Sequence, residues 1–305
     1  MTSPHQSFRL AYLILAHQYP DMVGPLMDSL TCEGVEFYLH IDAKSSMFEP
    51  LFKTYQHAKN VHFVKRHAIY WGHHSMIEAM LSLLQAAHQD GCDYMVLISG
   101  QDLPLKSATT LKLFYEAHKE VVFLNHQPLP VSYWEGGGVD RLDHYWFVRY
   151  RVKGLRFKLY NVLWGYPMTY LSKRLKYRKQ GPIKTFYAGA QWFNLNDQAV
   201  NAILGYLEEN PKALNQFKHT LIPDEVFIQT VLAASGYQGV LHTSSLRYVD
   251  WRSGPEYPKT LRQEDYDVLT QSDALFARKF DPNVDAAIIE RIKVYASKQE
   301  SFIKL

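Results

Sequence analysis

Short apolar runs alternate with amphipathic stretches over residues 1–125. The apolar runs predict buried strands, and apolar positions at helical spacing predict helices between them. Strands that alternate with helices are typical of βαβ units, so we expect an α/β fold with a mostly parallel central sheet flanked by helices. The predicted strands are residues 10–16, 35–41, 61–64, 94–98 and 121–124, and the predicted helices are residues 20–30, 75–88 and about 107–118.

The pattern changes from residue 127. Pro128, Pro130 and three successive glycines at 136–138 predict a long loop, and regular structure is predicted to resume at residue 186. We therefore expect one domain over 1–305, with a nucleotide-binding half (1–125) and an acceptor and catalytic half (126–305) that contains a basic, aromatic-rich insertion at about 128–185. The later predicted elements are a strand at 186–195, helices at 198–208 and 224–234, a strand at 240–245 and a final helix after 281.

Polar side chains follow three of the predicted strands. His17 comes after the first strand, Asp42 after the second, and Asp102 lies just beyond the fourth. Ligands of open parallel sheets bind at the carboxyl ends of strands. His17, Asp42 and Asp102 are therefore expected on one rim, where Asp102 could accept from sugar or ribose hydroxyls; for Asp102 and Asp42 a simple turn cap is the alternative.

Two further motifs carry side chains that could take part in catalysis, one as a base and one as a pair of cations. Pro223-Asp224-Glu225 begins a predicted helix, where Asp224 suits the cap and Glu225 could face a ligand as a general base. Arg278 and Lys279 lie between two phenylalanines and could be aimed at a diphosphate. A capped surface helix and a solvated charge pair are the competing interpretations.

No metal site is expected. The single Asp-x-Asp, formed by Asp265 and Asp267, falls in a predicted helix over 261–269, where side chains two apart diverge, so we expect both at the helix surface. His73 and His74 are adjacent, and their rings are expected to point apart.

Composition narrows the function classes. Hydrophobic residues make up 47% of the 305 residues, which supports a sizeable core, and the net charge of +3 is too small to favour nucleic acid as a partner. The two cysteines, Cys32 and Cys92, are expected to be reduced core thiols. No leader or spanning segment is evident, so we expect a cytoplasmic protein that could lie on the inner face of a membrane.

Residues 144–196 are basic and aromatic. They hold eleven Lys or Arg and no acidic residue, interleaved with Trp, Tyr and Phe. This mixture is typical of segments that contact lipid headgroups, so peripheral contact with a membrane or a lipid-linked acceptor is expected. A solvated surface, a lid over the donor site and, last, nucleic-acid binding are the alternatives.

Eight motifs in fixed order resemble the core-2/I-branching β-1,6-N-acetylglucosaminyltransferases and peptide O-xylosyltransferases, glycosyltransferase family 14, over about residues 8 to 285. The motifs are Leu15-Ala16-His17, His40-Ile41-Asp42, Tyr70-Trp71-Gly72-His73-His74-Ser75, residues 99–105, Gly189-Ala190-Gln191-Trp192, Pro223-Asp224-Glu225, Pro258-Lys259-Thr260-Leu261 and residues 276–281.

The resemblance implies a GT-A-like fold and inverting, metal-independent transfer from a UDP-sugar, with no cofactor, to a glycan or lipid-linked acceptor. It implies that Glu225 is the base and that Lys279, with Arg278, neutralises the leaving diphosphate. N-acetylglucosamine and xylose are the expected donor sugars. Other implied substrate contacts are His17, Asp42, Tyr70, Trp71, Asp102, Gln191, Trp192 and the less secure Lys259, with Trp134, Glu135 and Arg141 as positional guesses for the acceptor side.

Animal members of that family carry a membrane anchor and several disulfides, neither of which is evident here. The chain therefore resembles a soluble bacterial branch, in which donor and acceptor vary. Two rival functions remain open at this stage: a non-catalytic glycan- or membrane-binding module on the same fold, and a metal-dependent GT-A enzyme.

Overall fold

A central seven-stranded sheet organises the chain. The computed structural model describes residues 7–151, 154–175, 178, 181–255 and 257–300. The strand order is β10-β6-β9-β4-β1-β2-β3; β9 pairs antiparallel with both neighbours, and the remaining pairs are parallel. The α/β architecture with a mostly parallel central sheet flanked by helices is thus confirmed. The strands are β1 (Leu10–Ala16), β2 (Val35–Ile41), β3 (Val61–Phe63), β4 (Tyr94–Ser99), β6 (Val121–Leu124), β9 (Phe193–Asn196) and β10 (Val240–His242).

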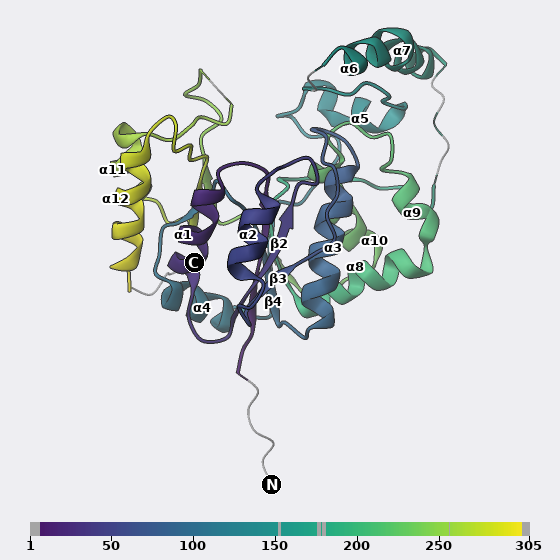
Figure 1. Cartoon of the computed structure of the whole chain (residues 1–305). Coiled ribbons are helices and arrows are strands. Elements are labelled where there is room, and N and C mark those ends of the chain that lie inside the picture. Colours follow the sequence, from purple (N-terminus) through teal and green to yellow (C-terminus); the bar gives the residue numbers. More distant parts are fainter. Residues whose placement is uncertain (1–6, 152–153, 176–177, 179–180, 256, 301–305) are drawn as a thin grey trace.

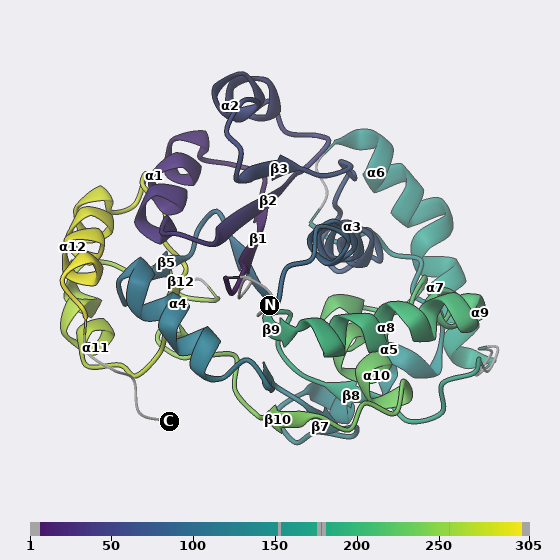
Figure 2. The same ribbon diagram turned by 90° about the horizontal axis from the view of Figure 1, so that it is seen from below.

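Helices bury both faces of this sheet (Figure 2). In β1, Leu13 belongs to one hydrophobic cluster and its neighbour Ile14 to another, because successive side chains point to opposite faces. This two-sided burial is why β1 is a continuous apolar run. One face is covered by α3 (Ser75–Gln89), α8 (Asp197–Glu209) and α10 (Phe227–Ala234), and the other by α1 (Pro20–Leu30), α2 (Phe48–Tyr55) and α4 (Ala108–Ala117).

A smaller sheet, which the sequence pattern does not predict, extends the site side of the molecule. Its order is β11-β12-β5, and a third cluster packs it against α11 and α12. The elements are β5 (Leu103–Pro104), β11 (Arg247–Val249), β12 (Phe276–Arg278), α11 (Tyr266–Thr270) and α12 (Ala286–Ser297). Because β12 ends at Arg278, this sheet carries one of the predicted cations to the rim of the larger one.

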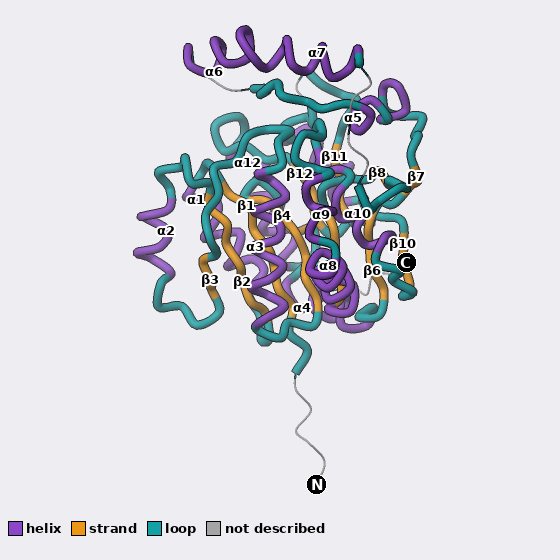
Figure 3. Tube along the Cα trace, turned by 90° about the vertical axis from the view of Figure 1, so that its right-hand side faces the viewer, coloured by secondary structure: helices purple, strands orange, loops and turns teal. Residues whose placement is uncertain are grey.

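Part of the predicted insertion is helical. It contains α6 (Leu155–Tyr160), η2 (Asn161–Gly165) and α7 (Tyr166–Arg174), which follow one another as one run over the end of the molecule opposite the N-terminus (Figures 1 and 3). We call residues 155–174 the helical arm. Below it lie η1 (Glu135–Gly138), α5 (Asp140–Asp143) and the antiparallel pair of β7 (Gln127–Pro128) and β8 (Tyr187–Ala188). Helix α9 (Pro211–Asn215) follows α8.

Three predicted elements differ from the structure. The strand expected over 186–195 is two strands, β8 and β9, separated by the loop 189–192. The helix expected over 224–234 begins as a 3-10 turn, η3 (Pro223–Glu225), and turns α-helical only at Phe227. The helix expected over 261–269 is the turn η4 (Gln263–Asp265) followed by α11.

Candidate active site

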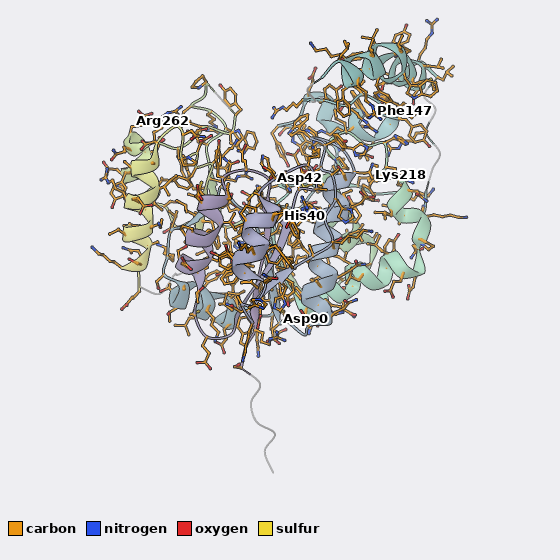
Figure 4. All side chains as sticks on the ribbon, in the orientation of Figure 1. His40, Asp42, Asp90, Phe147, Lys218 and Arg262 are labelled. Atoms are coloured by element: carbon orange, nitrogen blue, oxygen red, sulfur yellow. The ribbon has the colours of Figure 1, made fainter. Side chains whose placement is uncertain are left out.

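The ends of three neighbouring parallel strands build the rim on which the predicted residues lie. The amide of Asp42 donates to the Ala16 carbonyl at 2.9 Å, and the amide of Gly100 donates to Leu15 at 3.0 Å. The loops after β1, β2 and β4 therefore leave the sheet together. Figure 4 shows Asp42 at this edge and Asp90 at the opposite end of the sheet.

Asp42 is buried and shapes the loop that follows β2. Its Oδ1 accepts from the amide of Lys44 at 2.8 Å, and Arg66 donates to the Asp42 carbonyl at 3.0 Å. Desolvation lowers the pKa of His17; Asp42 opposes that shift, while Lys279, Lys44 and Arg278 add to it. These charges act on one another across the rim, and His17 is a neutral ring at pH 7.

Tyr70 and Trp71 lie in a loop that basic side chains stack upon. The Lys44 ammonium lies 4.4 Å from the centre of the Tyr70 ring, and the Arg149 guanidinium lies 5.1 Å from it. The Arg151 guanidinium lies 4.2 Å from the centre of the Trp71 ring, which stays 41% exposed. The loop after β3 is therefore clamped between the rim and the segment that leads to the helical arm.

Asp102 is completely buried, so the expectation that it accepts directly from a sugar hydroxyl is not met in this structure. Ser99 Oγ donates to Asp102 Oδ1 at 2.6 Å, and the Ser99 amide donates to Oδ2 at 3.2 Å. Two arginines face the same carboxylate: Arg278 Nε lies 3.5 Å from Oδ1, and Arg247 Nε lies 4.0 Å from Oδ2. Asp102 thus acts inside the protein as the counter-charge of two cations.

Trp192 is the platform under these cations. The guanidinium of Arg278 lies 4.0 Å from the centre of its ring, and that of Arg247 lies 5.6 Å from it. Burial lowers the pKa of Arg247 to about 10, and Asp102 opposes that shift. Both arginines still carry their charge at neutral pH. They therefore supply fixed positive charge just beneath the rim.

Lys279 reaches the rim because both of its neighbours are anchored. Arg278 is held as described, and the amide of Phe280 donates to the Gln101 carbonyl at 3.0 Å. Gln101 Nε2 donates back to the Phe280 carbonyl at 2.9 Å. These two bonds fix the 278–280 segment on the loop that follows β4, which brings Lys279 within electrostatic reach of His17.

The loop 189–192 joins this cationic side to the predicted base. Gly189 donates its amide to the Glu225 carbonyl at 2.9 Å, while Trp192, three residues later, carries Arg278. A Cβ on Gly189 would lie 2.0 Å from the Asn125 carbonyl oxygen, so only glycine fits there. That close approach breaks the predicted strand. Gln191 lies half-buried in the same loop.

Glu225 is half-buried and paired. Arg141 Nη1 donates to its Oε2 at 2.8 Å, and the Arg141 guanidinium stacks on Trp134 with 3.7 Å to the ring centre. Of the three acceptor-side guesses, Arg141 therefore touches the predicted base directly, and Trp134 supports Arg141. Glu135 is exposed in the turn η1.

Asp224 does not cap a helix, contrary to expectation. Its side chain is buried, and Oδ1 has no hydrogen-bond partner. Burial raises the pKa of Asp224 to about 7, and the neighbouring Glu225 carboxylate adds to the shift while Arg141 opposes it. Asp224 thus holds its proton to a higher pH than an exposed aspartate does.

Three other sequence-based expectations change. Lys259 Nζ is bound to Asp265 at 2.7 Å and Glu264 at 3.2 Å, so it lies in an ion-pair cluster before α11. Asp265 is buried by that pairing and is not at a helix surface, whereas Asp267 is exposed.

The His73 and His74 rings do not point apart, because their centres lie 4.0 Å from each other. In the described ranges, no group of three or more His, Cys, Asp or Glu side chains is arranged to hold a metal ion.

The sequence did not predict two residues of this site. Arg247 begins the three-residue strand β11, too short to stand out, and only the fold brings it to Asp102. In the sequence Lys44 looks like an ordinary surface lysine, and only the structure shows that it lies over the Tyr70 ring. No local signal in the sequence marks either of them.

The rim thus has buried arginines on one side and an arginine-held carboxylate, Glu225, on the other. The family model for the Core-2/I-branching enzyme matches residues 10–273, most of the chain. The chain belongs to the Core-2/I-branching enzyme family.

The similar curated proteins are xylosyltransferases. Xylosyltransferase 2 of Rattus norvegicus is 25% identical over 92% of this chain, xylosyltransferase 1 of Homo sapiens 21% over 96%, and xylosyltransferase oxt of Drosophila melanogaster 22% over 93%. The aligned part is 33%, 31% and 33% of those proteins, so the chain spans about a third of their length.

A solved structure described as a Bacillus anthracis glucose-1-phosphate thymidylyltransferase also aligns, with a TM-score of 0.36 and 11% identity over 96% of this chain and 97% of that one. This distant likeness carries no argument here.

The raised pKa of Asp224 predicts a pH-dependent stability difference. The folded state keeps the proton up to pH about 7, whereas the unfolded chain loses it near pH 3.9, so this residue's stabilising contribution falls as pH rises from about 4 to 7. Asp224→Asn should therefore have a higher free energy of unfolding than wild type at pH 8, by a few kcal/mol in order of magnitude. At pH 4 the two proteins should differ little. Urea titrations at both pH values measure this, with the exposed Asp273→Asn as control; equal differences at pH 4 and 8 would contradict the assignment.

Proposed function

We propose that this protein is an inverting glycosyltransferase that moves a sugar from a UDP-sugar to an acceptor hydroxyl without a metal ion, with Glu225 as the base. One observation carries the proposal: the loop 189–192 binds the Glu225 turn at its start and seats Arg278 at its end. A base and a cationic leaving-group site are thereby held on one short, rigid connection. The family relationship and the xylosyltransferase relatives support the reaction class.

In the proposed step the acceptor oxygen attacks the anomeric carbon as the bond to the diphosphate breaks. Glu225 takes the acceptor proton, and the electron pair of the broken bond leaves on the diphosphate. Arg141 holds the Glu225 carboxylate in one orientation through the 2.8 Å contact. Attack from the face opposite the leaving group inverts the configuration.

The leaving diphosphate is stabilised by fixed positive charge. Lys279 lies at the rim, and Arg278 and Arg247 are held beneath it by Asp102 and Trp192. Cations fixed before the reaction need little reorganisation as charge develops, which is the most effective form of electrostatic catalysis. Lys259 would have to leave Asp265 to join them, so we assign it to the support of the loop before α11.

The nucleoside is proposed to bind at the carboxyl ends of β1 and β2, near His17, Asp42 and Tyr70. A neutral His17 can both donate to and accept from uracil or ribose groups. The donor sugar is proposed to be N-acetylglucosamine or xylose, and the acceptor a glycan or a lipid-linked saccharide. Peripheral membrane contact through 144–196 fits an acceptor of the second kind.

The first prediction for this function concerns the base. Glu225→Gln keeps the size of the side chain and an oxygen for Arg141 but removes basicity, so kcat should fall by about 10²–10⁴-fold. UDP affinity should stay near the wild-type value, because the change lies on the acceptor side. Single-turnover transfer assays and UDP calorimetry measure both, with the exposed Glu209→Gln as control. Near-wild-type turnover in Glu225→Gln would refute the assignment.

The second prediction concerns the leaving group. Activity should persist in excess chelator, and Lys279→Ala should lower kcat by about 10²-fold or more because a donor to the departing diphosphate is lost. Lys212→Ala, on the distant α9, is the matched control and should leave kcat unchanged. Activity that disappears with chelator and returns with manganese would instead support a metal-dependent enzyme.

The third prediction separates an enzyme from a non-catalytic binder. UDP, UDP-N-acetylglucosamine and UDP-xylose should each stabilise the folded protein, by about 2.7 kcal/mol at a concentration of a hundred times the dissociation constant. Thermal-shift and calorimetric titrations compare the three ligands, with CMP as the control nucleotide, and the tightest UDP-sugar identifies the donor. Glycan or lipid binding without any UDP binding would favour the binding module.

A further inference from the structure

The helical arm turns polar side chains toward the protein and apolar side chains outward, which is the reverse of an ordinary surface helix. Its inward face carries Asn161, Thr169 and Ser172, all buried. Their side chains accept from three alternate backbone amides of the segment below: Ser172 from Tyr145 at 2.8 Å, Thr169 from Phe147 at 2.9 Å and Asn161 from Arg149 at 2.9 Å. Polar groups, and not a hydrophobic stripe, therefore hold the arm to the protein.

The helix approaches this segment very closely. Gly165 lies on the same inward face, and a Cβ there would lie 3.3 Å from Val148 Cα. Asn161 Nδ2 also donates to the Arg149 carbonyl at 2.8 Å, so this one side chain pairs with both polar groups of Arg149. The attachment is specific, and it fixes which face of the arm points outward.

The outward face is apolar. Six side chains spaced three or four residues apart along most of the arm are each between 49% and 73% exposed, and they form one stripe on a helix of this period. They are Leu155, Leu159, Val162, Leu163, Tyr166 and Tyr170, and Trp164, Leu171 and Leu175 are also exposed. An apolar stripe of this extent on a soluble surface marks an interaction site.

The charges beside the stripe indicate what covers it. Arg156 and Lys158 are exposed near the start of the arm, and Lys173 and Arg174 near its end. The sequence between Asp143 and Asp197 offers no acidic residue to balance them. A second copy of the chain seated on the same face would bring like charges together, whereas an anionic bilayer offers both the apolar phase and the counter-charge.

Three other cations of this segment have partners within the protein. Arg178 donates to the carbonyl of His144 at 3.0 Å and to Thr220 at 2.6 Å, and burial lowers its pKa. Arg149 and Arg151 stack on Tyr70 and Trp71. Arg178 is therefore not among the cations that could face lipid, and Lys153, Lys176, Tyr177 and Lys179 lie outside the described residues.

We infer that the helical arm lies in the plane of an anionic membrane and inserts its apolar stripe among the lipid chains, so that attachment depends mainly on Leu159, Val162 and Leu163 and survives high salt. At about 1.5 Å per residue the arm is roughly 30 Å long, and within the described part of the chain no helix is long and apolar enough to cross a bilayer. It therefore lies on the surface.

Docking in this way would hold the rim beside the membrane. Phe157 of the arm lies 5.8 Å, centre to centre, from the Tyr70 ring in the donor-side loop. This inference rests on the proposed function only for its purpose, which is to meet an acceptor carried by the same membrane. The attachment itself is testable without any transfer reaction.

The experiment is flotation of the full chain with vesicles of phosphatidylcholine, with or without phosphatidylglycerol, at low salt and at 1 M salt. Wild type should float with the anionic vesicles and keep most of its binding at 1 M salt, where charge attraction is screened within about 3 Å. Changing Leu159, Val162 and Leu163 together to Gln should weaken vesicle binding by about tenfold or more. UDP affinity should be unchanged in this variant.

The matched control is the triple variant Leu113→Gln, Val268→Gln, Val294→Gln, which removes three comparably exposed apolar side chains from α4, α11 and α12; its vesicle binding should equal that of wild type. Three results would overturn the inference. The first is that wild type does not bind vesicles, and the second is that 1 M salt abolishes vesicle binding while the arm variant still binds at low salt. The third is that wild type sediments as a dimer and the arm variant as a monomer. Failure of wild type to bind UDP would instead overturn the proposed function and leave the vesicle result standing.

Discussion

The buried carboxylate of Asp102 is the interaction on which the candidate site depends. It lies at the end of β4, where Ser99 fixes both of its oxygens, and it is the counter-charge of Arg278 and Arg247. Without it two guanidinium charges would be buried unpaired, and an unpaired buried charge costs several kcal/mol. Asp102 thereby joins the large sheet to the small one and fixes the path of the chain into Lys279.

The predicted base is positioned differently, by contacts between loops. Arg141 pairs with Glu225 and is itself held against Trp134, and the Glu225 carbonyl accepts from Gly189. The cationic side of the site is built on strand ends, whereas the basic carboxylate rests on turns and an arginine from α5. Because loops change more readily than a sheet, the carboxylate side of the site is the part that is freer to vary.

The helical arm extends the same division outward. Its polar inner face forms hydrogen bonds with the backbone of residues 145–149. The apolar face points the other way and stays exposed in the described part of the chain. A helix built in this way gains its attachment from hydrogen bonds that only one orientation satisfies. The arm and the donor-side loop share contacts through Tyr70, so what covers the arm also lies next to the rim.

The central sheet, the rim and the family could all be predicted from the pattern of residues along the chain. Apolar runs such as residues 10–16 are strands because both of their faces are buried, and the motifs that end at His17 and Asp42 lie at the strand ends where they were expected. What only the tertiary structure decided was the partner of each charge: Asp102 with Arg278 and Arg247, Glu225 with Arg141, Lys259 with Asp265. These pairs join residues far apart in the chain or bury a side chain expected at the surface, so local pattern holds no record of them. The same reason explains why Asp224 is buried and does not cap a helix. It also explains why a basic, aromatic segment forms a helix with its apolar side outward.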